Sequence, residues 1–127
     1  VDAVHRMAEI APLAVASSSP RVLIEAGLEL LGVAHLVSVV VSTEEVDRGK
    51  PHPDGFLAAC RQLQVDPTAA VAIEDSTNGI ASALAAGMKV VAVPPHFHPP
   101  APDVLARAHA VIGDLDALTV DLVRGLF

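Results

Sequence analysis

The sequence predicts an α/β fold in which helices cover both faces of a doubly wound parallel sheet. Short runs of β-branched and small apolar residues recur along the chain, and segments of helical length separate them. The runs cover residues 13–16, 36–41, 70–73, 89–93 and 110–112. Because these runs carry apolar residues on both faces, they are typical of strands buried in a parallel sheet.

Three segments between the predicted strands carry helix signals. Residues 20–31 begin with Pro20 at the first helical position, directly after Ser19 as the predicted N-cap. Residues 53–64 also begin with a proline, and their apolar positions recur at helical spacing. Those positions are Phe56, Leu57, Cys60 and Leu63. Residues 77–86 are rich in alanine, so we expect this helix to pack closely on the sheet.

The C-terminal part predicts less regular structure. Residues 103–109 and 114–125 are expected to form shorter helices. Residues 93–100 contain too many prolines for a helix or a strand and are expected to form an exposed loop. His96 and His98 in this loop have a spacing that could suit a metal, but no third ligand follows at a suitable distance. A surface loop is therefore the preferred interpretation.

The composition narrows the class of protein. A chain of 127 residues predicts one domain with a single core. With 8 basic against 15 acidic residues, the net charge of −7 argues against nucleic acids and anionic membranes as partners. The apolar runs are far shorter than the roughly 20 residues that cross a bilayer, which predicts a soluble protein. The single cysteine, Cys60, is expected in the core, and no secretory signal pattern is found, so we predict a cytoplasmic location.

Three serines follow the first predicted strand at its carboxyl end, which is the edge where ligands bind in such sheets. Ser17, Ser18 and Ser19 lead directly into a helix. Hydroxyl groups and backbone N–H groups at a helix start suit an anion such as phosphate. The same residues could instead only cap the helix and fill a turn.

Charged residues follow the next two strands. Lys50 lies between a glycine and a proline, a backbone that would hold its ammonium group beside the sheet, although a solvated loop lysine is the alternative. Glu74 and Asp75 follow a strand directly. Two adjacent carboxylates at the rim of a sheet are tolerable when a hard cation such as Mg²⁺ lies there. Asp75 or Ser76 could instead cap the following helix.

Taken together, these positions resemble the motifs of the haloacid dehalogenase-like hydrolase superfamily, and most closely its beta-phosphoglucomutase-like and sugar-phosphatase branch. Residues 14–20, 49–56, 73–80 and 86–88 carry the resemblance, in the order that the family has them. The resemblance implies a Rossmannoid core and a Mg²⁺-dependent phosphomonoester hydrolase or phosphomutase that acts through an aspartyl-phosphate. The implied partner is a small phosphorylated substrate.

The resemblance also implies a role for each matching residue. Ser17 would bind the transferring phosphoryl group, assisted by N–H groups around Ser18. Lys50 would balance charge between that group and the nucleophile. Glu74 and Asp75 would hold Mg²⁺, with Asp75 the better candidate for a direct ligand.

The family's nucleophile motif, Asp-x-Asp at the end of an N-terminal strand, is not found before Ser17. Asp114 and Asp116 have the right spacing but follow all other motifs, and we interpret them as helix caps. The helical cap domain is not found either. We therefore expect residues 1–127 to be a fragment of a longer protein, a partial core domain without its central strand. Each polar backbone group left unpaired would cost about 1 to 3 kcal/mol, so we expect a missing N-terminal segment or another chain to complete the sheet.

Two other classes of function are considered. A catalytically inactive phosphate- or metal-binding remnant, or a partner subunit, would keep the same residues. A signalling receiver domain also combines acids, hydroxyl groups and a lysine on a parallel sheet. In receivers the acids come first and the lysine last, whereas here the serines precede Lys50 and Lys50 precedes the acids. This order argues against a receiver.

Overall fold

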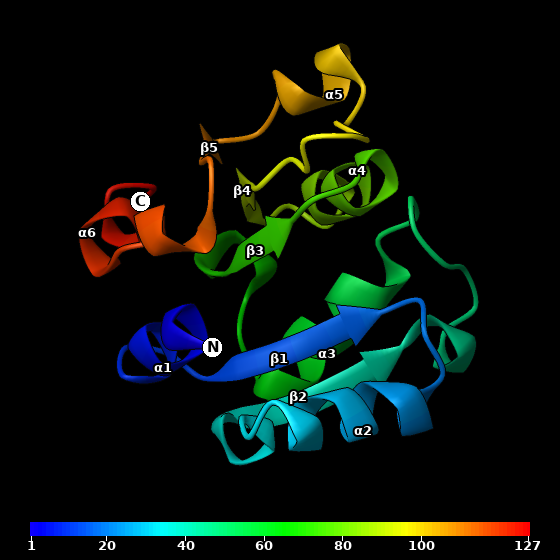
Figure 1. Ribbon diagram of the computed structural model, residues 1–127. Coiled ribbons are helices and arrows are strands. Elements are labelled where there is room, and N and C mark those ends of the chain that lie inside the picture. The colour runs from blue at the N-terminus through cyan, green and yellow to red at the C-terminus, as the bar shows by residue number, and fades with distance from the viewer.

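The computed structural model describes all residues, 1–127, and contains two parallel sheets (Figure 1). In the first sheet, β1 (Leu13–Ser17) pairs with β2 (Val37–Ser42). In the second, β4 (Lys89–Ala92) lies between β3 (Val71–Glu74) and β5 (Ala110–Val111). All five predicted strands are present, and every pairing is parallel. The predicted α/β class is confirmed.

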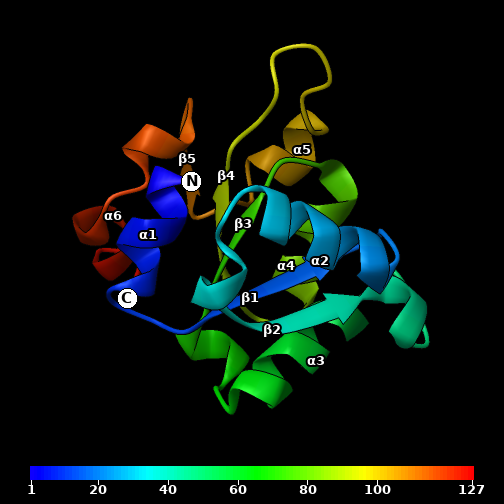
Figure 2. The ribbon, with the colours of Figure 1, turned by 60° about the horizontal axis from the view of Figure 1, so that its bottom comes forward.

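Helices cover both faces of the first sheet, as a doubly wound fold requires (Figure 2). On one face, Val40 of β2 borders the groove beside α2 (Arg21–Leu30). On the other, Val41 packs against two alanines of α3 (Asp54–Leu63). The alternation of neighbouring valines between the two faces explains why residues 39–41 of this strand are all apolar.

The main core lies between the second sheet and the helices α3 and α4 (Thr77–Ala85). Its nine buried residues are Phe56, Cys60, Ala72, Ile80, Ala83, Ala86, Met88, Val90 and Ala92. The alanines on α4 let the helix lie close to the strands, as expected. Cys60 is in the core as predicted, and burial, with a smaller contribution from the charge of Asp66, raises the pKa of its thiol.

The terminal helices form a smaller packed unit. α1 (Asp2–Ala8) and α6 (Val120–Arg124) pack at a second cluster that includes Ala3 and Val91. The Arg6 guanidinium adds hydrogen bonds to backbone carbonyls near the C-terminus. None of the helices in the molecule combines the length and the apolar character that a bilayer-spanning segment needs.

The structure corrects two predicted helices near the C-terminus. Instead of a helix over residues 103–109, α5 (Pro102–Leu105) is a single turn. The helix predicted over residues 114–125 is broken into a 3-10 turn and α6, because Asp114 and Thr119 each cap a separate turn. The Asp114 carboxylate accepts the N–H of Asp116, which confirms its interpretation as a cap.

The predicted capping role of Ser19 is wrong. α2 begins at Arg21, Pro20 is the N-cap residue, and no side chain caps the helix. Pro20 has an extended ψ of 147°, so the chain turns into the helix one residue later than predicted. Residues 93–100 form the expected loop without helix or strand, and His96 and His98 in it are exposed.

Candidate functional site

The carboxyl ends of β1 and β3 meet at Lys50. Its ammonium group donates to the carbonyl oxygen of Ala16 in β1 at 3.3 Å and pairs with the carboxylate of Glu74 at the end of β3. The side chains of Lys50 and Glu74 are only 15% and 10% exposed. The ring of Phe56 lies 5.0 Å from the ammonium nitrogen and adds a cation–π contact. Lys50 is therefore fixed between the two sheets and is not a solvated loop lysine.

The carboxylate of Glu74 is enclosed by the start of α4. The N–H of Asp75 donates to Glu74 Oε2 at 3.3 Å. A Cβ placed on Gly79 would lie 2.0 Å from the same oxygen, so this close approach requires glycine. The amino end of a helix also favours a negative charge beside it. Glu74 is thus held in one position by Lys50 and by α4.

Ser76 and Asp75 were both candidates for capping α4, and the structure assigns the cap to Ser76. The Ser76 hydroxyl accepts the N–H of Gly79 at 3.0 Å and caps α4. The Asp75 side chain is exposed and makes no ion pair or hydrogen bond. Asp75 is therefore the carboxylate that remains free to bind a ligand.

The serine turn leaves β1 next to Lys50. Ser17 Oγ accepts the N–H of Ser19 at 3.2 Å, which leaves the hydroxyl hydrogen of Ser17 free to donate. Ser17 follows Ala16, whose carbonyl binds the Lys50 ammonium group. Lys50 therefore contacts the residue before Ser17 on one side and Glu74 of the acidic pair on the other.

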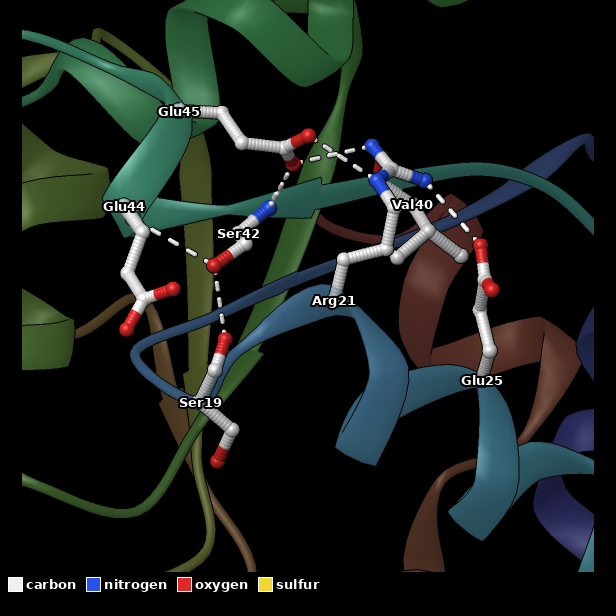
Figure 3. A network of polar contacts seen from close by, with 7 residues as sticks. All are labelled: Ser19, Arg21, Glu25, Val40, Ser42, Glu44 and Glu45. Carbon is white, nitrogen blue, oxygen red and sulfur yellow. Dashed lines mark hydrogen bonds and ion pairs between the residues drawn. The ribbon is translucent and has the colours of Figure 1, made fainter.

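Sequence reasoning missed Ser42, which supports this turn from β2. Its hydroxyl donates to the Ser19 carbonyl at 2.7 Å, and its side chain is fully buried (Figure 3). Its backbone N–H donates to the carboxylate of Glu45, completing a capping box around the 3-10 turn Thr43–Glu45. A signal was present, because Ser42 and Glu45 have the S-x-x-E spacing of a capping box.

Arg21 stands near the turn but is already engaged. Its guanidinium donates to Glu45, Glu25 and the carbonyl of Val40 (Figure 3). The bond to Glu45 above all, and then the bond to Glu25, raise the pKa of Arg21. The same bond, followed by the N–H of Ser42, lowers the pKa of Glu45 below its usual value. Arg21 therefore fixes the loop and leaves Lys50 as the cation at the site.

The donor chemistry fits Mg²⁺ only in part. Glu74 and Asp75 offer the carboxylate oxygens that this ion prefers, and Asp75 is the free one. No group of three histidine, cysteine, aspartate or glutamate side chains is placed to hold a metal ion, and this includes His96 and His98. The acidic pair would be part of a ligand set, with Asp75 as the direct ligand.

A hydroxyl, an ammonium group and an acidic pair thus follow the carboxyl ends of strands in a parallel α/β protein, which is where ligands bind in such sheets. The chain belongs to the haloacid dehalogenase-like hydrolase family, whose profile matches residues 2–93. The resemblance of its sequence motifs to this family is confirmed.

Individual relatives support the sugar-phosphatase branch. The validoxylamine A 7'-phosphate phosphatase of Streptomyces hygroscopicus subsp. limoneus is 34% identical over 116 residues, which cover 91% of this chain and 53% of that protein. The fructose-1-phosphate phosphatase YqaB of Escherichia coli is 42% identical over 82 residues, 65% of this chain and 44% of that protein.

A solved structure shows the same fold. The phosphate complex of CbbY from Rhodobacter sphaeroides superposes with a TM-score of 0.86 at 26% identity, over 97% of this chain and 56% of that one. The chain therefore spans about half the length of the relatives that it matches.

Proposed function

We propose that this chain supplies the phosphate- and Mg²⁺-binding residues of a phosphomonoester hydrolase or phosphomutase. Its named relatives are phosphatases of the same family, which supports phosphatase chemistry for the whole protein. The observation that carries the proposal is the position of Lys50, whose ammonium group is buried between two strand ends beside Ser17 and the acidic pair. A lysine that served only solubility would not be held by three separate partners.

Each residue has a distinct part in the proposed reaction. The free hydroxyl hydrogen of Ser17 and the N–H of Ser18 donate to oxygens of the phosphoryl group. Lys50 neutralises the charge that these oxygens carry in the transition state. Glu74 keeps the ammonium group of Lys50 aimed at that place. When Mg²⁺ is bound beside Asp75, it withdraws charge from the phosphoryl oxygens.

The attacking group is proposed to come from outside residues 1–127. The family's reaction proceeds through an aspartyl-phosphate, in which a carboxylate attacks phosphorus and the alcohol leaves. Glu74 is already bound to Lys50, and no group of three acidic, histidine or cysteine side chains is placed to hold a metal ion. The same observation favours a second candidate, a phosphate- and metal-binding partner subunit without activity of its own.

The single, unpaired cysteine suits a reducing compartment, and we propose the cytoplasm.

Titration with inorganic phosphate, with and without Mg²⁺, tests the binding role. Amide resonances of residues 17–19 should shift in an NMR titration of the chain. Ser17→Ala and Lys50→Met should each weaken phosphate binding about tenfold, which corresponds to about 1.4 kcal/mol. Ser38→Ala, which alters an exposed serine of β2, is the matched control and should bind as the unmodified chain does. Equal affinity in all four proteins would contradict the proposal.

An assay with p-nitrophenyl phosphate and Mg²⁺ tests where the nucleophile lies. We expect the 127-residue chain to bind phosphate without robust turnover. Turnover that Asp75→Asn abolishes and the control Asp121→Asn leaves intact would show that the nucleophile is within the chain. That result would contradict the proposed division of the active site.

A further inference from the structure

The third strand of the second sheet is attached to β4 over a very short length. β5 has only two residues. Just before it, the N–H of His109 donates to the carbonyl of Val90 at 2.9 Å. Just after it, the N–H of Ile112 donates to the carbonyl of Ala92 at 2.9 Å. The chain from β5 to the C-terminus, including α6, follows this short attachment (Figure 1).

The imidazole of His109 supplies a further hydrogen bond to β4. The N–H of Val90 donates to His109 Nδ1 at 3.0 Å. The neighbouring N–H of Lys89 donates to the carbonyl of Ala70 on the β3 side, so that of Val90 is directed to the other edge. A parallel strand would offer a backbone carbonyl there. Because Val90 is 0% exposed, the side chain of His109 is the acceptor that keeps this buried N–H paired.

Only the neutral imidazole can make this contact. Its Nδ1 accepts a hydrogen bond when the ring proton is on Nε2, whereas both nitrogens of a protonated ring are donors. A protonated ring would therefore turn an N–H toward the N–H of Val90, and a buried N–H without an acceptor is destabilising. The side chain of His109 is exposed, so protons from solvent reach it. Histidine is the side chain that ordinarily changes charge between about pH 5 and 8.

The charged groups around His109 do not replace the lost contact. β4 carries Lys89, and β5 itself carries no charge. Asp103 is in α5, Arg107 is in the turn that follows α5, and Asp114 caps the turn that follows β5. None of these side chains forms an ion pair with His109. The bond to Val90 is thus the one side-chain hydrogen bond of this imidazole.

We propose that His109 is a proton-sensitive clasp, whose neutral imidazole holds β5 on β4 and whose protonation releases β5 from that edge. The contact is complete while the ring is neutral, and its contribution to stability is lost as the pH falls. Release would uncover apolar surface, because Val91 packs with Ile112 and Leu118 in the second cluster. The opposite edge of β4 is held to β3 by backbone groups alone and should not respond. The inference does not depend on the proposed function.

Amide hydrogen exchange at about pH 7.5 and about pH 5, corrected for the intrinsic rates, tests the proposal. The protection of the Ile112 N–H, which reports on β5, should fall at least tenfold in acid. The N–H groups of Lys89 and Val93 donate to the β3 side and should keep their protection. This difference between the two edges of one strand would not arise from general unfolding in acid.

Two variants assign the effect to His109. In His109→Asn the side-chain amide oxygen can accept the N–H of Val90 but does not titrate, so Ile112 should remain protected at both pH values. His96→Asn removes an exposed histidine of the proline loop and should behave as the unmodified chain does.

Nitrogen NMR of the unmodified chain tests the contact without a variant. At about pH 7.5 the ring proton of His109 should be on Nε2, and a coupling through the hydrogen bond should join the Val90 amide nitrogen to His109 Nδ1. The coupling should disappear in acid. A ring proton on Nδ1 at the higher pH would contradict the proposal.

The remaining outcomes of the exchange experiment also overturn the clasp. An equal loss of protection in His109→Asn would show that another group titrates. Equal losses at Ile112, Lys89 and Val93 would show that acid unfolds the whole sheet. Full protection of Ile112 in acid would show that a proton on His109 does not release β5.

Discussion

The two sheets differ sharply in how well their strands are buried. Val90 and Val91 in β4 are 0% exposed, whereas all five residues of β1 are only partly buried. β4 has a strand on each edge, while β1 has one on a single edge. Strands of similar composition thus reach different burial, because a strand in a parallel sheet is covered by its neighbours as well as by helices.

The site lies at the boundary between these two regions, and each contributes different chemistry. The β1 side provides the hydroxyl of Ser17, and the β3 side provides the acids. Lys50 contacts both sheets. Helix α3 also contacts both, because its Phe56 belongs to the main core while its Ala59 packs on the β2 side. The relative positions of the hydroxyl and the acids therefore depend on how firmly the two sheets are held together.

The largest predicted loss of stability comes from removing Lys50, which links the two sheets. Lys50→Met leaves the carboxylate of Glu74, which is 10% exposed, without its cation. An unpaired charge of this kind costs about 3 kcal/mol. Urea denaturation of the variant should show a loss of this size. A loss below about 1 kcal/mol would show that the two sheets are held together by α3 alone.

The double variant Lys50→Met with Glu74→Gln sharpens this test. With no charge left unpaired, much of the lost stability should return, and the coupling energy of the cycle should be about 2 kcal/mol. Additive losses would mean that the ion pair does not join the sheets.

A matched pair of valine deletions compares the two regions directly. Val90→Ala removes buried methyl groups from the centre of β4 and should cost about 2 kcal/mol. Val15→Ala makes the same change in the half-buried β1 and should cost less than about 1 kcal/mol, because water already reaches this site. Equal losses in urea denaturation would contradict the difference in packing.

The sequence predicted most of this architecture, because the apolar runs and helix signals act locally. All five strands and the three main helices were identified from β-branched runs, prolines and spacing. The start of α2 and the broken C-terminal helix were missed, since each depends on one competing cap or on the ψ angle of Pro20. Local propensity does not settle which of two adjacent residues begins a helix.

The site was predictable in its residues but not in its contacts. Ser17, Lys50 and Asp75 were found from their positions after strands. That Glu74 binds Lys50, and so leaves Asp75 as the free acid, follows from the approach of Gly79, which is visible only in three dimensions. The support from Ser42 had a sequence signal, but its contact with Ser19 depends on how β2 lies beside β1.

The support from Ser42 predicts an effect of intermediate size, confined to the β1 side. Ser42→Ala leaves the Ser19 carbonyl without its donor and removes the cap of the turn that follows β2. The loss should be about 1 kcal/mol. Phosphate binding should weaken as well, because the serine turn is less well fixed. Ser82→Ala is the control, since Ser82 is equally buried and donates to the His52 carbonyl on the other side of the boundary. Stability should fall in both variants, and a loss of phosphate affinity in both would contradict a local role.

The smallest effect on stability is expected at Glu45. Its exposed carboxylate accepts the N–H of Ser42 in the capping box of the same turn. Its pKa is lowered first by Arg21 and then by the N–H of Ser42, so the folded state favours the ionised form. The stabilisation is therefore complete above the usual value of 4.5 and is lost as the pH falls through the lower pKa of the folded state. An NMR titration should place the midpoint of Glu45 below 4.5, and Arg21→Gln should move it upward. Because both side chains are solvated, the change in stability should be small and should shrink further in high salt. If the titration midpoint of Glu45 is the same in the Arg21→Gln variant, the N–H of Ser42 alone lowers the pKa of Glu45.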